Sequence, residues 1–319
     1  MSWGFHRRSR LVQALQQTLS ERLERATARL SAYPEASKPL AACVAAWLLD
    51  NPYSHHEEVP LVHRHALAQL EPLARGSDQS VPALFNQTLM LTLAAKTLSQ
   101  PTLSEPLLSL QHAEFERMVK DSRHQPETYY QLDLPRKPCE KDLSLAAGRS
   151  LAIGGAWLVE RRRVAIRNSW LPQRLQNIKV VQKIRHVLGL QPECLVVHTI
   201  ERHLRHFKAD KHEHAISNAF NYLRTQPKLA GIYRESWFLD PQVAKLSPAI
   251  AFLSELPIAH GARLYCKGPA TPAMIADAVG KSPQRKAAYA NGTYQPQLYA
   301  YFWSRDTHFN YPGTHTSTS

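Results

Sequence analysis

The chain has 319 residues, of which 44% are hydrophobic and 20% are charged, and this composition is typical of a folded protein and excludes wholesale disorder. The four cysteines lie far apart, which excludes a disulfide scaffold and zinc-finger spacing and predicts a reducing, cytoplasmic compartment. The longest apolar run, residues 42–49, is too short to cross a bilayer, so we expect no membrane partner.

Positive charge is concentrated in the second half of the chain. Residues 1–150 hold 17 Lys or Arg against 16 Asp or Glu, whereas residues 151–319 hold 22 against 10. The densest stretch, residues 160–211, holds 12 basic against 4 acidic residues. Such a field favours an anionic ligand, either a phosphate-bearing cofactor or a nucleic acid. A solvated face that only aids solubility explains the same charge.

Helical periodicity dominates the first part of the chain. Apolar residues recur at steps of three and four, with polar residues between them. These patterns predict helices over residues 9–32, 39–49, 60–73, 81–98 and 104–120. Residues 121–141 then carry three prolines and no sustained period. We therefore expect a helical domain over residues 1–120 and a connector over residues 121–145.

Strands and helices alternate from residue 146 onward. The apolar runs predict strands over residues 150–160, 162–169, 194–199, 229–236, 262–268 and 295–305. Helical patterns lie between them, including residues 172–188 and 203–224, and Asp240, Thr271 and Ser282 each precede a proline that opens a helix. We expect a basic α/β domain with a mixed sheet over residues 146–306, a disordered tail over residues 307–319, and an α+β or α/β fold class overall.

The segments LAGIYRES, ARLYCKG and QPQLYAYFW alternate with helices, and RKAAYANGTY places Tyr289 just before a Gly-containing turn. In these features residues 229–303 resemble the back half of the GCN5-related N-acetyltransferases. The resemblance implies an acyltransferase-like enzyme that uses an acyl-CoA-type donor and a small amine or amino-acid-like substrate. It also implies Tyr289 as the acid that reprotonates the leaving thiolate and Glu235 as the base for the amine, with the basic stretch holding the donor phosphates.

Polar residues follow two apolar strands where the chain leaves the sheet. His198 follows CLVV, and Ser236, Trp237 and Asp240 follow LAGIYRES. Ligands of α/β folds bind at the carboxyl ends of strands. We therefore predict a site with His198, Glu235 and Tyr289 as catalytic residues and with Arg202, Ser236, Trp237 and Asp240 as substrate-binding residues. A helix cap at Asp240 and a hydrophobic staple over residues 236–240 explain that segment equally well.

Two other interpretations come from the same half. Residues 271–292 resemble a helix-turn-helix in which Gln284, Arg285 and Lys286 open a recognition helix, which indicates nucleic-acid binding as an alternative function. A non-catalytic interaction protein is a further alternative. Histidines gather between His198 and His214, but the usual metal-binding signatures are absent, so we predict no metal site and leave the role of this cluster open.

Overall fold

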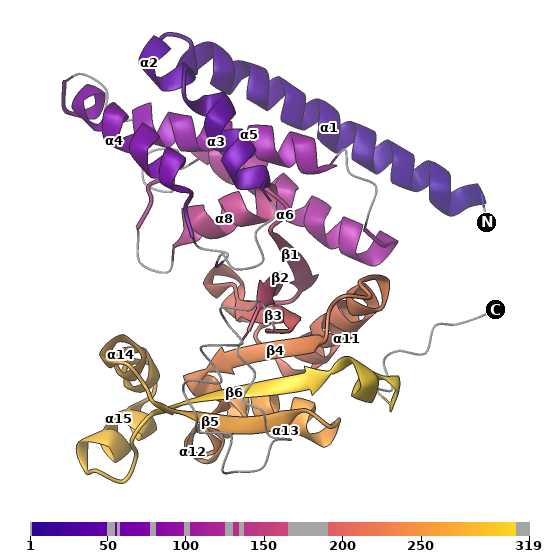
Figure 1. Ribbon diagram of the computed structural model, residues 1–319, viewed down its shortest axis with the longest axis vertical. Helices are drawn as coiled ribbons and strands as arrows, with labels where there is room; N and C mark the ends of the chain where they lie inside the picture. Colours follow the sequence, from indigo (N-terminus) through magenta and orange to yellow (C-terminus); the bar gives the residue numbers. More distant parts are fainter. Residues whose placement is uncertain are drawn as a thin grey trace. The chain divides into compact units, whose positions relative to one another are not determined.

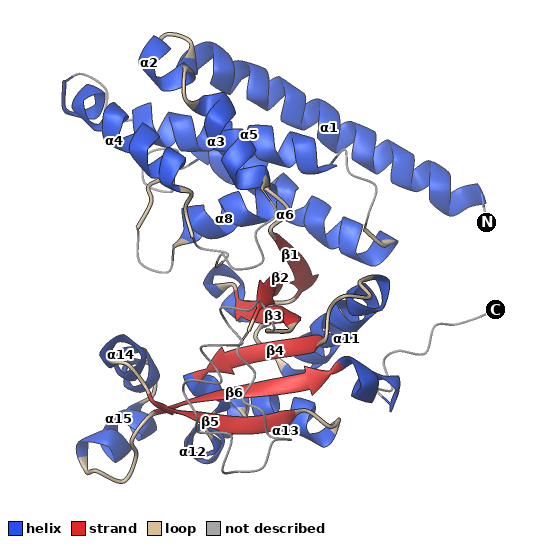
Figure 2. Ribbon diagram, viewed as in Figure 1, coloured by secondary structure: helices blue, strands red, loops and turns tan. Residues whose placement is uncertain are grey.

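Helices alone build the first part of the chain, and a mixed β-sheet with helices builds the second, as Figures 1 and 2 show. In this computed structural model the chain divides into two units, residues 1–152 and 153–319. The fold is thus α+β. The structure describes residues 2–49, 55, 58–76, 81–98, 103–124, 130–133, 137–164 and 191–310. The helix expected over residues 172–188 and the end of the expected tail lie outside these residues.

The first unit packs helices around one buried helix, α5. In chain order its helices are α1 (Ser2–Leu30), α2 (Pro34–Ser37), α3 (Leu40–Leu48), α4 (Leu61–Gly76), α5 (Val81–Leu98), α6 (Glu105–His124) and α8 (Pro138–Ala146). α5 contacts all of the others and is buried along nearly its whole length. A helix that is apolar on most of its sides is stable only when it is enclosed in this way. No helix in the described part of the chain is long and apolar enough to cross a membrane.

Residues 137–152 pack within the first unit, although the sequence pattern placed them in a connector and at the start of the second domain. α8 is buried, and Leu143 and Leu145 join the core of the first unit. Pro138, which we interpreted as part of a break, instead occupies the first turn of α8, where a proline is compatible with the helix. Pro138 therefore marks where a helix begins and not where a domain ends.

A six-stranded sheet in the order β1-β2-β3-β4-β6-β5 organises the second half of the chain, and the boundary between the two units falls within β1. Its strands are β1 (Ser150–Gly154), β2 (Trp157–Arg163), β3 (Glu193–Thr199), β4 (Gly231–Ser236), β5 (Arg263–Pro269) and β6 (Gln297–Ser304). β3 and β4 are parallel, whereas β2–β3, β4–β6 and β5–β6 are antiparallel. The strand expected over residues 150–160 is divided by a turn, because Gly154 and Gly155 both have positive φ.

The helices of the second unit are η1 (Glu201–His206), α11 (Ala209–Thr225), η2 (Trp237–Leu239), α12 (Pro241–Leu246), η3 (Pro248–Ile250), α13 (Phe252–Ala259), α14 (Pro272–Gly280), α15 (Pro283–Ala290) and η4 (Arg305–Asn310). Of these, α11 and α13 pack on one face of the sheet. Phe220 of α11 meets Trp303 of β6 edge to face, with ring centroids 4.7 Å apart. Because side chains alternate along a strand, Arg234 points to the same face as Trp303, and Tyr233 and Glu235 point to the other. We call these the Arg234 face and the Tyr233 face.

Candidate functional site

The Tyr233 face brings together two of the predicted site residues. In the parallel pair β3–β4, Val196 lies opposite Tyr233. His198 and Glu235 each follow two residues later, so both point to the Tyr233 face near the carboxyl ends of neighbouring strands. The described helices α11 and α13 pack on the sheet from its Arg234 face. The sequence predicted His198 and Glu235 at strand ends, and the structure also places them on the same face of the sheet.

His198 is held by a buried carboxylate on the adjacent strand. Its Nε2 lies 2.9 Å from Oε1 of Glu160, and the Glu160 side chain is only 3% exposed. Glu160 faces Val196 in the β2–β3 register while His198 faces Leu158, so the two side chains are diagonal neighbours on one face. Arg162 lies 3.9 Å from the same carboxylate oxygen. A carboxylate in this position fixes the imidazole orientation and stabilises the protonated ring.

Glu235 is the centre of a second polar group on this face. Its Oε2 accepts a hydrogen bond of 2.6 Å from the Tyr233 hydroxyl and forms an ion pair with Lys267 of β5. Lys267 Nζ also lies 3.4 Å from the Tyr233 hydroxyl oxygen. Burial, aided by the neighbouring Tyr265 and Glu235, raises the pKa of Tyr233, so this phenol stays protonated and donates. The carboxylate, ammonium and phenol form one hydrogen-bonded cluster.

Apolar side chains lie between the His198 pair and the Glu235 cluster on the Tyr233 face. Cys194, Val196, Tyr233 and Ala300 belong to one hydrophobic cluster, which includes the half-buried Tyr265 and Phe302 at its edge. Burial raises the pKa of the Cys194 thiol to about 12, so this cysteine is not a thiolate nucleophile at neutral pH. The Tyr233 face is thus apolar at its centre, with polar groups near the ends of β3 and β4.

Three predicted substrate-binding residues make structural contacts instead. Ser236 Oγ accepts from the Phe238 amide, and the Trp237 indole donates to Asp277 Oδ2 at 3.1 Å. Asp240 caps α12 through the Gln242 amide at 2.9 Å and accepts from the Gln297 amide at 3.1 Å. Burial raises the pKa of Asp240, and its two amide hydrogen bonds oppose this effect. These contacts agree with the alternative in which Asp240 caps a helix. We therefore leave Ser236, Trp237 and Asp240 out of the proposed site.

Arg202 and Tyr289 lie on separate helices. Arg202 is in η1, directly after β3, and η1 leads into the start of α11. Tyr289 is on α15 and is 37% exposed. No hydrogen bond or ring contact among the described residues joins Tyr289 to His198 or to Glu235. The acid role that the resemblance implies for Tyr289 stays a prediction.

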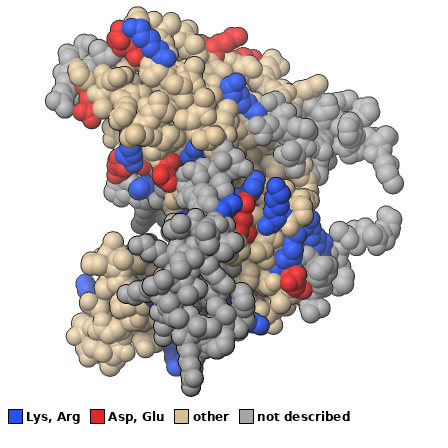
Figure 3. Space-filling model, viewed as in Figure 1, with Lys and Arg blue, Asp and Glu red and all other residues tan. Residues whose placement is uncertain are grey.

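The segment of residues 271–292 does form two helices, α14 and α15, joined at Lys281 and Ser282. However, Arg285 is buried: it donates to the Ala278 carbonyl at 2.6 Å and lies over the Trp237 ring. Gln284 and Lys286 stay exposed. On the face drawn in Figure 3, the Lys and Arg side chains of the described residues form several separate groups. Arg285 is therefore committed to the interior and is not available to base edges.

The histidine cluster does not assemble a metal site of its own. Among the described residues, none of His203, His206, His212 and His214 joins a group of three potential metal ligands. His203 and His206 have ring centroids 6.4 Å apart, and His212 of α11 is buried against Trp157. The absence of a metal at residues 198–214 stays a prediction.

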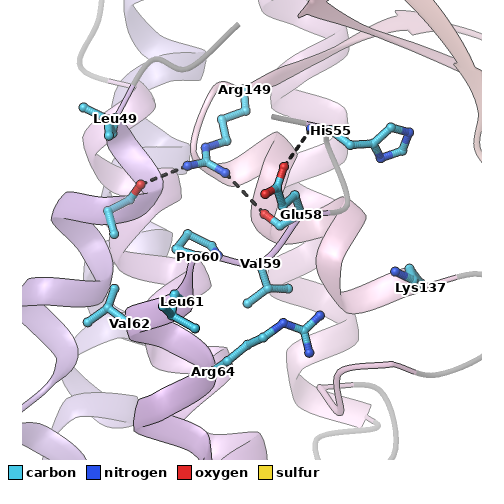
Figure 4. Close-up of a pocket in the computed structure, with 11 residues that line it drawn as sticks. Leu49, His55, Glu58, Val59, Pro60, Leu61, Val62, Arg64, Lys137 and Arg149 are labelled. Carbon is cyan, nitrogen blue, oxygen red and sulfur yellow. Dashed lines mark hydrogen bonds between the residues drawn. The ribbon is translucent and has the colours of Figure 1, made fainter. Parts of the chain in front are cut away.

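A cavity of about 790 Å³ lies in the first unit. Figure 4 shows Arg64, Lys137 and Arg149 around it, together with apolar side chains such as Leu49 and Leu61. Arg149 donates to the carbonyls of Ala46 and Trp47, and Arg64 pairs with Asp133 at 3.0 Å. Both guanidinium groups are thus used to hold the fold. We assign the cavity no function.

Comparison of the chain with protein-family models, with curated proteins and with solved structures finds no match. The geometry of the Tyr233 face therefore carries the functional argument by itself. Sequence reasoning missed Glu160, Tyr233 and Lys267 as members of this site. The available signal was Glu160, an acidic residue inside the apolar run WLVE, which we treated only as the start of the basic stretch.

Proposed function

We propose that the second unit is an acyltransferase-like enzyme, which moves an acyl group from an acyl-CoA-type thioester to a small amine. The observation that carries this proposal is the pairing of His198 with the buried Glu160 on the face that also presents Glu235. An amine attacks a thioester only after it loses its ammonium proton, so the reaction needs a base of near-neutral pKa close to a group that binds cations. Histidine and carboxylate supply these two functions.

The proposed step uses His198 as the base. The imidazole takes a proton from the substrate ammonium, and the nitrogen lone pair forms a bond to the thioester carbonyl carbon. The carbon–sulfur bond then breaks, the new amide nitrogen sheds its second proton to the leaving thiolate, and the imidazolium returns its proton to the solvent. Glu160 orients the ring and stabilises the imidazolium while it carries the proton. Such general base catalysis contributes on the order of 10²–10⁴ in rate.

Glu235 fits a role in substrate binding better than the base role that the resemblance implies. Its carboxylate already accepts a hydrogen bond from the Tyr233 hydroxyl and pairs with Lys267. A half-exposed carboxylate held in this way attracts a substrate ammonium group. If Glu235 acted as a base, its carboxylate would take up a proton and would lose these two contacts. We therefore assign the amine-binding role to Glu235 and the proton transfer to His198.

The donor phosphates fit the start of α11 and not the start of α12. Asp240 fills the amides of α12, as the sequence indicated. The cap of α11 at Lys208 makes no side-chain hydrogen bond, and Arg202 and Arg205 precede it in η1. Helix amides and basic side chains together favour a pyrophosphate. This position directly follows β3, which carries His198.

Donor binding provides the first test. We expect acetyl-CoA and free coenzyme A to raise the melting temperature of the full-length protein, because a ligand that binds the folded state stabilises it. The double variant Arg202→Gln/Arg205→Gln should lose most of this rise. Arg224→Gln, an exposed arginine in the last turn of the same helix, is the matched control and should keep it.

A short DNA duplex in the same experiment separates the nucleic-acid alternative. Stabilisation by DNA without any response to coenzyme A would favour binding through the exposed Gln284 and Lys286. An equal response of the Arg202/Arg205 variant and the Arg224 variant to acetyl-CoA would contradict the phosphate position at α11. Screening by salt should weaken true phosphate contacts, so the rise is measured at two salt concentrations.

A further inference from the structure

On the opposite face of the sheet, Arg234 is a buried cation that pairs with no carboxylate of the described residues. Its side chain lies in the middle of β4 and is 2% exposed. Nη2 donates to Thr199 Oγ1 at 3.1 Å, whereas Nη1 has no hydrogen-bond partner, and no carboxylate forms an ion pair with this guanidinium, among the residues that the structure describes. Arginine stays charged in proteins, and an uncompensated buried charge costs several kcal/mol.

Three further polar groups around Arg234 are buried without partners. They are the His212 ring on α11, the Tyr301 hydroxyl on β6 and the Trp157 indole nitrogen on β2, each of them fully buried. Both ring nitrogens of His212, Tyr301 Oη and Trp157 Nε1 make no hydrogen bond of good geometry within the described part of the chain, although Tyr301 Oη lies close to the Arg234 guanidinium. Native proteins leave few buried polar atoms unsatisfied, so four such side chains in one place indicate a missing species.

Arg234, Tyr301 and Trp157 lie on the same face of the sheet, and His212 of α11 contacts Trp157 there. Arg234 faces Tyr301 in the β4–β6 register, and Trp157 faces Thr199, which binds the guanidinium, in the β2–β3 register. The Trp157 and His212 ring centroids are 4.7 Å apart, and the charge of Arg234 acts on both His212 and Tyr301. All four side chains thus converge from β2, β4, β6 and α11.

Most of the unpaired groups are donors. Guanidinium and indole N–H groups only donate, the Tyr301 hydroxyl donates and accepts, and a neutral imidazole donates from one nitrogen and accepts through the other. A species that lies among them must accept several hydrogen bonds and, because the charged side chain among these four is positive, is favoured if it is negative. The four side chains are at most 2% exposed, so the species is small.

We propose that Arg234, His212, Tyr301 and Trp157 form a buried binding site for one small inorganic anion of the size of chloride. The anion compensates the guanidinium charge and cross-links α11 to the central strands. This site lies on the face opposite to His198 and Glu235 and is independent of the acyl transfer proposed there. A buried water molecule is the competing occupant, because it also accepts hydrogen bonds but leaves the charge uncompensated.

Arg285 provides a matched control. It is also a buried arginine without a carboxylate ion pair in the described residues, but its donors are satisfied by the Ala278 carbonyl at 2.6 Å and by Ser247 Oγ at 2.5 Å. The net charge of +13 makes general effects of salt certain. A response that is specific to Arg234 must therefore exceed the response of an Arg285 variant.

The test replaces gluconate with chloride at constant ionic strength and follows the melting temperature of the full-length protein. Once the site fills, we expect wild type and Arg285→Met to gain roughly 3–5 °C for each tenfold increase in chloride. Arg234→Met should gain nothing. An equal chloride response in Arg234→Met and Arg285→Met, or none in wild type, would overturn the proposal.

A crystallographic measurement covers the case in which Arg234→Met does not fold. Crystals of the wild-type protein grown in bromide are expected to show an anomalous bromide peak within hydrogen-bonding distance of Arg234 Nη1. Density for water alone at this position, without an anomalous signal, would sink the proposal. A second peak elsewhere on the surface would have no bearing, because a protein with this charge attracts anions at many places.

Discussion

Replacement of Arg117 by methionine is expected to lower the free energy of unfolding by about 3–5 kcal/mol, because it leaves a buried carboxylate without its partner. Arg117 of α6 binds Asp142 of α8 at 2.7 Å, and the Asp142 side chain is 1% exposed. The same guanidinium pairs with Glu114 at 2.9 Å and with Asp121 at 2.8 Å. Loss of the arginine therefore destabilises the packing of α8 against the other helices of the first unit.

Urea unfolding of the full-length protein, followed by far-UV circular dichroism, measures this change. Lys38→Met is the control, because Lys38 forms an exposed pair with Glu35 and should cost at most about 1 kcal/mol. The double variant Arg117→Met/Asp142→Leu should recover part of the loss, since it removes the stranded charge. If Arg117→Met costs no more than Lys38→Met, α8 is not held by this network.

Acid should destabilise the first unit through His63. This histidine is fully buried, accepts from the Trp47 indole at 3.0 Å through Nδ1, and places Nε2 2.7 Å from Asn86 Oδ1. Nδ1 is thus unprotonated, and Nε2 donates. Burial lowers the pKa of His63 from 6.5 to about 4, against the hydrogen bond to Asn86, which raises it. Charging the ring breaks the bond from Trp47.

The sign follows from the lowered pKa. The unfolded chain binds this proton more tightly, so the contribution of His63 is complete above pH 6.5 and is lost as the pH falls toward 4. A shift of this size corresponds to about 3 kcal/mol. We expect His63→Gln to show a flatter decline in unfolding free energy between pH 7 and pH 4.5 than His65→Gln, an exposed control on the same helix. Identical slopes would contradict the assignment.

The sequence predicted local structure well where a single pattern decides it. The helix over residues 81–98 coincides with α5, and the helix starts expected at Asp240, Thr271 and Ser282 are confirmed by capping hydrogen bonds. A cap is a contact between neighbours in the chain, so it can be read without the fold. Pro138 shows the limit, because proline marks both a break and a helix start, and only packing distinguishes the two.

The partners of the site residues depend on which strands pair and in which register, and the sequence does not show this. His198 and Glu235 were placed at strand ends from their positions after apolar runs, and the structure puts them on one face. Their partners Glu160 and Lys267 come from β2 and β5 and are 38 and 32 residues away from them in the sequence. We expected polar groups at the strand ends. Glu160 and Arg234 instead lie buried within their strands. Glu160 is paired with His198, and Arg234 is the residue for which we propose a bound anion.

Turnover by the full-length protein tests the central claim most directly. Mass spectrometry of mixtures that contain acetyl-CoA and a panel of small amines should detect an acetylated amine with the wild-type protein. His198→Gln should reduce its rate by about 10²–10⁴-fold. His214→Gln, an exposed histidine on α11, should keep the wild-type rate. The account predicts this contrast in a His198→Gln protein that stays folded, because a glutamine amide can still donate to the buried Glu160 carboxylate. An acetylated amine formed equally fast by both variants, or by none of the three proteins while acetyl-CoA is bound, would contradict it.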